Sequence, residues 1–269
     1  MPPKVWRRTL LAVLSFSVVT GALVSTATTS DLSAVRLVAW LLVILVVMAT
    51  GFVLWHLLPD FDPSGRTLRR LPAGRGRIAL TFDDGPNGAH TEAVLDALAD
   101  AGAHATFFVV GESARRQPGL VRRMVREGHV VGNHTFSHAL LPMLPTDAVA
   151  RELDDAQRAI VKAGAPPPRL FRAPKGFKHR RLHRLLQERS LTLCGWTRGV
   201  WDTDRPGVEV IVARAKEAVQ DGAILLLHDG LAGLDRAQTS EALRHILALC
   251  RERGLTPVTL VQGATPSPT

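Results

Sequence analysis

The sequence predicts an α/β domain with a parallel sheet, open or closed into a barrel, behind an apolar N-terminal region. Between residues 77 and 262, short apolar runs alternate with amphipathic stretches, which is the pattern of repeated strand–helix units. The run Ala223–Leu227 is apolar without interruption, as expected for a strand that is covered on both faces. Before residue 59 lie two long segments, 9–30 and 37–58, that contain no Asp, Glu, Lys or Arg. The short connector between them carries Asp31 and Arg36.

The two apolar segments, 9–30 and 37–58, are each long enough to cross a hydrocarbon core of about 30 Å as a helix. The second is dense in Leu and Val, with Trp40 and Trp55 towards its ends, where interfacial tryptophans are common. We therefore expect one or two transmembrane helices in contact with membrane lipid. The first segment can also be interpreted as a signal peptide, because basic residues precede it and Ser25–Ala27 resembles a cleavage site.

Composition limits the remaining possibilities. The chain has 33 Lys and Arg against 24 Asp and Glu, so its net charge is +9, which favours anionic partners. We expect no nucleic-acid binding, because no recognised module or interleaving of basic and aromatic residues is present. Residues 59–76 are rich in Pro, Gly and Arg and indicate a basic linker, while residues 263–269 indicate a tail. The domain is expected over 77–262, and no protein partner can be identified.

The expected elements alternate along the domain. The expected strands are Arg77–Phe82, Ala105–Val110, His129–Gly132, Leu170–Arg172, Leu191–Cys194, Ala223–Leu227 and Pro257–Leu260. The expected helices are Thr91–Ala101, Ala114–Glu127, Asp147–Ala163, His179–Arg189, Val208–Gln220 and Arg236–Arg253. In parallel α/β folds the chemistry lies at the carboxyl ends of the strands, so the residues that follow each strand are the candidates for a site.

Two adjacent carboxylates, Asp83 and Asp84, follow the first strand and precede a Gly-Pro turn. Neighbouring residues of a strand point to opposite faces, so these two side chains need separate partners. Ordinary turn chemistry is the alternative explanation of Asp-Gly-Pro.

Histidines follow two other strands. His134 and His138 come after the third strand and lie on one face if the segment coils, which is a spacing that suits a metal. Two His and one carboxylate form a common catalytic metal shell with open positions for water. His228 ends the sixth strand, and Arg172 ends the fourth, where its charge could keep a carboxylate ionised. Four strand ends thus converge on one chemistry.

Taken together, these motifs resemble the polysaccharide deacetylases with the NodB homology domain, carbohydrate esterase family 4. The resemblance spans about residues 77–260, and five motifs appear in the family's order. They are Thr81-Phe-Asp83-Asp84-Gly-Pro, His134-Thr-Phe-Ser-His138, Arg172-Ala-Pro-Lys175-Gly, Trp201-Asp202-Thr and Leu226-Leu-His228-Asp229. The resemblance implies a distorted (β/α) barrel of the NodB type with a groove across its top.

The resemblance also implies roles for individual residues. Asp84, His134 and His138 would hold a divalent metal, usually zinc, whose shell is completed by water. Asp83 would be the general base for that water, and His228 would protonate the leaving amine.

Supporting roles are implied for four further residues. Arg172 would orient Asp83, and Asp202 would tune His228 or the arginine network. The backbone N–H of Lys175 would stabilise negative charge on the carbonyl oxygen, and Leu226 would shape the pocket for the acyl methyl.

Two positions depart from the family pattern. Lys175 stands where the family usually has Tyr, so the groove loses an aromatic wall that Trp196 or Trp201 could replace. In the fourth motif, commonly Asp-x-x-Asp-Trp, Asp202 is the expected match and Asp204 the alternative.

Three functional hypotheses follow. The first is a metal-dependent N-deacetylase of an envelope glycan with N-acetylglucosamine units, such as peptidoglycan, anchored in a bacterial inner or plasma membrane. The second is a deformylase or deacetylase of a polyprenyl-phosphate-linked sugar at the membrane surface. The third is a glycan-binding pseudoenzyme that has kept the metal. The family favours a domain outside the membrane, whereas the Arg residues after Leu58 favour the cytoplasmic side.

Overall fold

The computed structural model describes residues 37, 39–48, 65–230 and 236–261, in two units, Met1–Phe61 and Asp62–Thr269. In the first unit the described residues are helical, and apolar side chains such as Leu41 and Met48 are exposed. None of the helices found among the described residues is both long and apolar enough to span a membrane. The predicted span 9–30, half of the span 37–58 and the tail 263–269 lie outside the described residues.

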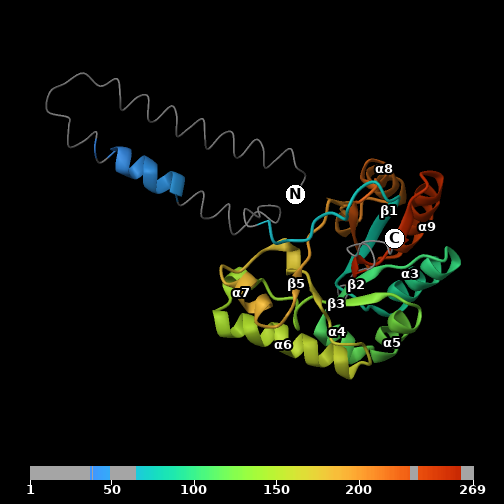
Figure 1. Cartoon of the computed structure of the whole chain (residues 1–269), viewed down its shortest axis with the longest axis horizontal. Coiled ribbons are helices and arrows are strands. Elements are labelled where there is room, and N and C mark those ends of the chain that lie inside the picture. The colour runs from blue at the N-terminus through green and yellow to red at the C-terminus, as the bar shows by residue number, and fades with distance from the viewer. Residues whose placement is uncertain (1–36, 38, 49–64, 231–235, 262–269) are drawn as a thin grey trace, which may run out of the picture. The chain divides into compact units, whose positions relative to one another are not determined.

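The second unit is built on a parallel sheet with β1 (Arg77–Asp83) at its centre (Figure 1). On one side of β1 lie β2 (Thr106–Val109), β3 (Val130–Asn133), β4 (Leu170–Phe171) and β5 (Thr192–Leu193), in that order. On the other side lie β7 (Ile224–His228) and β6 (Arg198–Gly199), and β8 (Thr256–Val258) pairs with the start of β1. Among these strands β5 and β6 are the two ends, so the distorted barrel expected from the sequence is a curled half-barrel.

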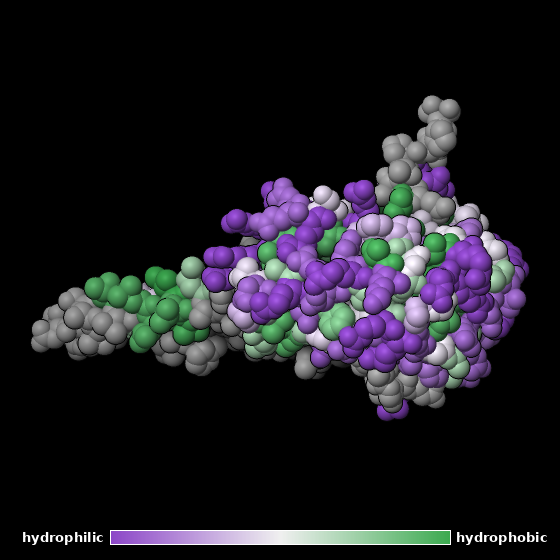
Figure 2. Space-filling model, turned by 90° about the horizontal axis from the view of Figure 1, so that it is seen from below, coloured by the Kyte–Doolittle hydropathy of each residue, from purple (hydrophilic) through white to green (hydrophobic). Residues whose placement is uncertain are grey.

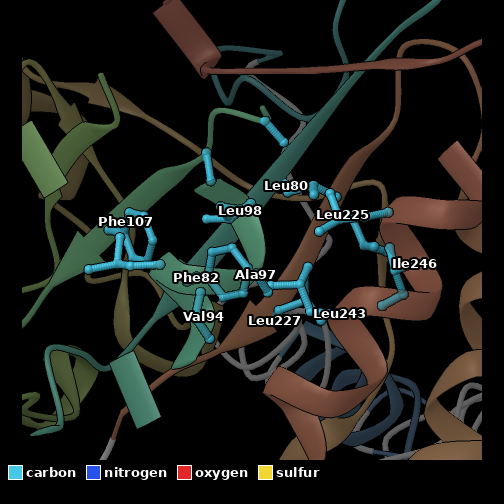
Figure 3. Close-up of a cluster of buried hydrophobic side chains, with 14 of the residues drawn as sticks. Leu80, Phe82, Val94, Ala97, Leu98, Phe107, Leu225, Leu227, Leu243 and Ile246 are labelled. Carbon is cyan, nitrogen blue, oxygen red and sulfur yellow. The ribbon is translucent and has the colours of Figure 1, made fainter. Parts of the chain in front are cut away.

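Alternation along the strands divides the core into two layers. Leu80 and Phe82 of β1, with Leu225 and Leu227 of β7, pack outward against the helices in the largest hydrophobic cluster (Figure 3). Ala79 and Ile224, which directly precede Leu80 and Leu225, belong to a separate, inner cluster with Phe108 and Cys194. Successive residues of a strand point to opposite faces. Thr81, Asp83, Leu226 and His228 therefore face the inner side of the curl.

Helices cover the outer face. They are α3 (Gly88–Asp100), α4 (Gly111–Arg116), α5 (Pro118–Arg126), α6 (Thr146–Lys162), α7 (Leu182–Gln187), α8 (Val208–Ala218) and α9 (Ala237–Glu252). Short 3₁₀ turns η1 (Leu141–Met143), η2 (Pro174–Gly176) and η3 (Asp202–Asp204) lie in the connections. Seen from below, the second unit is covered mainly by hydrophilic side chains (Figure 2).

Two expectations about the elements need correction. The single helix predicted over Ala114–Glu127 is two helices, because Pro118 lacks the N–H that a continuous helix would use and instead starts α5. The strand β6 was not predicted, since two residues between Trp196 and Trp201 carry no periodic signal.

The segment 67–71 joins the two sides of the half-barrel. Leu68 N–H donates to the carbonyl of Leu193 in β5, and Leu71 N–H donates to the carbonyl of Gly222 before β7, each at 2.8 Å. Leu71 is buried in the inner cluster with Cys194. This part of the predicted basic linker 59–76 is thus hydrogen-bonded to the domain. Both cysteines, Cys194 and Cys250, are buried and free.

Candidate active site

The predicted functional side chains meet at the carboxyl edge of the central strands. Asp83 is the last residue of β1 and lies in register with His228, the last residue of β7. His134 directly follows β3, and its N–H donates to the carbonyl of Val109 at the end of β2. Arg172 directly follows β4. Parallel strands bring these ends to one edge, which is why residues far apart in sequence form one cluster.

Asp84, His134 and His138 form the centre of this cluster. Asp84 Oδ1 lies 3.4 Å from His134 Nε2 and 3.0 Å from His138 Nε2, and candidate ligand atoms of the three lie within 4.8 Å of one another. Among the described residues, no other group of three His, Cys, Asp or Glu meets this criterion. Burial would raise the pKa of Asp84, but hydrogen bonds with both histidines lower it well below its usual value.

The histidine loop is not helical, contrary to the coiled segment that the i, i+4 spacing indicated. Thr135 and His138 both have left-handed backbones, at φ 67° and φ 59°. His134 Nδ1 lies 2.8 Å from the carbonyl oxygen of Arg172 and donates to it, so Nε2 is the ring nitrogen that faces Asp84. The donor set therefore fits a divalent metal such as zinc: two imidazole nitrogens and one carboxylate, with one imidazole fixed by an outer hydrogen bond.

Asp83 has a different partner from Asp84, as the strand geometry required. Arg172 Nη1 donates to Asp83 Oδ1 at 2.7 Å and to Thr81 Oγ1 at 2.8 Å. Arg172 Nη2 donates to the carbonyl of Gly195 at 2.7 Å, and the guanidinium stacks over the Phe108 ring at 4.2 Å. This fully buried cation pairs with Asp83 and fixes its orientation, while Asp83 Oδ2 lies 3.8 Å from His134 Nε2.

His228 is held by Asp202. Asp202 Oδ1 lies 2.8 Å from His228 Nδ1, while its Oδ2 accepts hydrogen bonds from the His228 N–H at 2.8 Å and from Thr239 Oγ1 at 3.0 Å. Burial would lower the pKa of His228, but the charge of Asp202 raises it to about 9. Between the two aspartates considered for the fourth motif, this geometry places Asp202 beside His228, whereas Asp204 is exposed.

The three residues predicted to bind substrate lie around this edge. Leu226 is two residues before His228 on the same face of β7. Lys175 is exposed in η2 with φ 55°, three residues after Arg172. Trp201 is 40% exposed, also has a left-handed backbone, and directly precedes Asp202. Trp196 instead lies near the buried guanidinium of Arg172, at 5.7 Å.

Glu152 of α6 is a site residue that the sequence reasoning missed. Its carboxylate accepts hydrogen bonds from the N–H groups of Phe136 and Ser137 at 2.9 Å and from Ser137 Oγ at 2.8 Å. One side chain thus ties down the loop between His134 and His138. No local motif in the sequence indicates this contact, because it spans 15 residues.

Asp229 directly follows His228 in the fifth motif, and the sequence-based predictions assign it no role. It is buried, and its Oδ2 accepts a hydrogen bond from Thr91 Oγ1 at 2.6 Å. Burial raises its pKa to about 7. A side chain at position 85 would collide with the Asp229 carboxylate, so Gly85 allows the chain that carries Asp84 to lie directly against β7.

The chain is similar to known proteins. Residues 70–193 match the family described as Polysaccharide deacetylase. A peptidoglycan-N-acetylglucosamine deacetylase of Bacillus cereus is 35% identical over 203 residues, which cover 75% of this chain and 94% of that protein. A chitooligosaccharide deacetylase of Sinorhizobium fredii is 39% identical over 198 residues, covering 70% and 92%.

Solved structures share the fold. A family 4 carbohydrate esterase from Streptomyces lividans, in complex with acetate, has a TM-score of 0.66 and 31% identity. The match covers 72% of this chain and 99% of that one. A peptidoglycan N-acetylglucosamine deacetylase in complex with 4-naphthalen-1-yl-N-oxidanyl-benzamide has a TM-score of 0.72 and 27% identity, covering 75% and 94%.

Proposed function

The chain belongs to the polysaccharide deacetylase family, and from this premise we propose that it removes acetyl groups from N-acetylglucosamine units of an envelope glycan such as peptidoglycan, with the help of zinc. The relatives named above act, by their names, on peptidoglycan N-acetylglucosamine and on chitooligosaccharides. One observation carries the proposal for this chain. A carboxylate with two histidines, a second carboxylate held by Arg172, and a histidine held by Asp202 all meet at one strand edge.

Asp84, His134 and His138 would hold the metal. When bound, a divalent metal supplies Lewis-acid chemistry, which polarises the acyl carbonyl and makes a nearby water more acidic. The chain's own contribution is to fix the ligands: Arg172 sets the His134 ring through its carbonyl, and Glu152 holds the loop that carries His138.

Asp83 is the proposed general base. Its carboxylate is buried, ion-paired with Arg172 and held at the edge where the substrate must lie. Taking a proton from water there would generate the nucleophile next to the acetamido carbonyl.

His228 is the proposed general acid. Asp202 accepts a hydrogen bond from Nδ1 of His228 and raises the pKa of this histidine. The imidazole is therefore protonated at neutral pH and can give a proton to the leaving amine. Asp202 is in turn held by Thr239, so the orientation of the pair is fixed before substrate binds.

Substrate contacts are proposed for the three rim residues. The backbone N–H of Lys175 would donate to the carbonyl oxygen as it gains negative charge. Leu226 would contact the acyl methyl, and the exposed indole of Trp201 would supply an apolar wall for the sugar. The complete acid, base and metal set at one strand edge favours catalysis over a non-catalytic, glycan-binding role.

Membrane attachment is a separate part of the proposal. The exposed apolar helix at 39–48 and the uncharged composition of residues 37–58 support an anchor in a bacterial inner or plasma membrane. A reporter fused after Thr269, active only outside or only inside, tests the side. An external reporter signal would favour assembled wall glycan, and a cytoplasmic signal would favour the lipid-linked sugar.

The activity test is acetate release by the full chain in detergent, on N-acetylglucosamine oligomers and on peptidoglycan fragments. We expect release that stops with chelator and returns with zinc. His138→Ala should abolish it, while Asp147→Asn, on an exposed part of α6, should not. Zinc-independent release, or no release from any N-acetylated glycan, would contradict the proposal.

A further inference from the structure

Basic residues are strongly segregated in the segment that runs from the second half of α6 to the end of α7. From residue 156 to residue 187 there is no Asp or Glu, although the same stretch holds nine Lys and Arg. They are Arg158, Lys162, Arg169, Arg172, Lys175, Lys178, Arg180, Arg181 and Arg184. Arg172 is fully buried and is neutralised by Asp83, whereas the others are on or near the surface. Arg158 is compensated by Asp155 within α6, so the charge open to a partner outside the chain comes from exposed residues in the later part of this stretch.

The middle of this basic stretch lies at the active site. Lys175 is three residues from Arg172, whose carbonyl contacts His134, so their Cα atoms lie within about 11 Å of each other. Ala173, Pro174 and Gly176 are buried, and hydrogen bonds from Gly176 N–H to Ala173 (2.8 Å) and from Phe177 N–H to Pro174 (3.1 Å) fix the turn. The turn is thus rigid, while the Lys175 side chain is exposed.

The stretch then continues along the surface. His179 and Leu182 are buried and attach this part of the chain to the domain, and Arg181 N–H donates to His179 Nδ1 at 3.2 Å. Arg180 and Arg181, between these two buried positions, are exposed. Arg184 is compensated by Glu188 at 2.9 Å. No described acidic side chain forms an ion pair with Lys175, Arg180 or Arg181, and we call these three residues the cationic rim.

We propose that the cationic rim recognises an anionic group of the glycan substrate, a carboxylate or a phosphate, that lies near the reacting acetamido group. This inference rests on the proposed deacetylase function and specifies its substrate class. Clustered positive charge beside a site raises the local concentration of anionic substrate, and a flexible ammonium group can pair with either anion. A neutral chitooligosaccharide has no group that benefits.

Exposed charges are screened by salt, so the effect must depend on ionic strength. An exposed ion pair is worth up to about fivefold in affinity. We therefore expect the preference for an anionic over a neutral substrate to be roughly fivefold at low salt and to shrink as salt is raised.

The test compares kcat/KM for acetate release by the full chain on three substrates. These are neutral chitotetraose, glycan strands bearing lactyl carboxylates, and an N-acetylglucosamine oligomer bearing a terminal phosphate. Arg180→Gln/Arg181→Gln and, separately, Lys175→Gln should each lower the ratio of anionic to neutral kcat/KM from roughly fivefold towards one. Arg180→Lys/Arg181→Lys should retain the ratio. If the rim variants lower this ratio for only one of the two anionic substrates, that substrate carries the anion that is recognised.

A charge-matched control is Arg244→Gln/Arg251→Gln, which removes two exposed cations from α9. This helix follows β7, which lies on the opposite side of β1 from β4 and β5. This control should keep both the activity and the ratio. An anionic-to-neutral ratio near one in the unmodified chain, or a ratio unchanged by both rim variants, would overturn the inference while leaving the deacetylase intact. Absence of acetate release from all three substrates would instead overturn the proposed function.

Discussion

Arg172 has more functional contacts than any other single residue described at the site. Its guanidinium holds Asp83 and Thr81, and its carbonyl fixes the His134 ring. A side chain that is fully buried and charged is stable only with such partners. One residue thus sets the base and one of the candidate metal ligands at the same time.

Arg172→Met is expected to leave the Asp83 carboxylate buried and unpaired. Breaking a buried ion pair in this way costs about 3–5 kcal/mol in the free energy of unfolding. Urea unfolding measures this cost, and acetate release should fall below detection. The milder Arg172→Lys keeps the charge but loses the forked geometry, so it should recover part of the stability and little of the activity. Equal stability of the Met variant and the unmodified chain would contradict the role.

His228 makes the alkaline side of the pH profile a test of Asp202. The pKa of His228 is raised from 6.5 to about 9, so the stabilisation from its pair with Asp202 is fully present below pH 6.5 and is lost as the pH rises through 9. Asp202→Asn removes the charge that raises this pKa. The alkaline limb of the kcat profile should therefore move to lower pH, whereas Asp204→Asn should leave it in place.

At the scale of elements, strand ends were predictable because short apolar runs mark the strands and the polar residues follow them directly. Asp83, His134, Arg172 and His228 were found in this way. Glu152 was not, because its contact with the histidine loop depends on how α6 packs against β3 rather than on any local spacing. The spacing of His134 and His138 places them on one face if the segment coils, but Thr135 and His138 adopt left-handed backbones, which sequence spacing does not reveal.

Glu152 gives the element-scale prediction. Glu152→Gln removes one of two acceptor oxygens that hold the N–H groups of Phe136 and Ser137 and the Ser137 hydroxyl. Outer contacts of this kind change metal affinity by about 10–100-fold. We expect at least a tenfold weaker zinc affinity by competition with a chelator, and an altered absorption spectrum of the cobalt form.

The matched control is Asp147→Asn on the same helix, where the carboxylate is exposed and pairs with Arg151. This variant should bind zinc as tightly as the unmodified chain. Equal zinc affinity of the Glu152 variant would show that the loop needs no support from α6.

At the scale of the whole molecule, the sequence predicted a parallel sheet but not how it ends. The open edges at β5 and β6 leave a half-barrel, and residues 67–71 bridge its two sides. These residues belong to the stretch 59–76, whose Pro, Gly and Arg content indicated a basic linker. Their backbone hydrogen bonds and the burial of Leu71 could not be derived from composition, because they depend on strands far along the chain.

Leu71 tests this bridge. The side chain is 3% exposed and belongs to the inner cluster with Cys194 and Ile224. Leu71→Ala should lower the free energy of unfolding by about 2–5 kcal/mol, as for other buried leucines. Leu68→Ala, at a half-buried neighbouring position, should cost clearly less. Equal small effects at both positions would show that the segment is not part of the fold.

The most direct test of the central claim is to measure zinc content and acetate release together on Asp83→Asn in the full chain. The account assigns Asp83 to proton transfer and Asp84, His134 and His138 to the metal, although the two aspartates are adjacent. It therefore predicts one zinc per chain, as in the unmodified protein, with acetate release reduced by about 100-fold or more. Near-normal acetate release, or loss of zinc together with activity, would contradict this division between the two carboxylates.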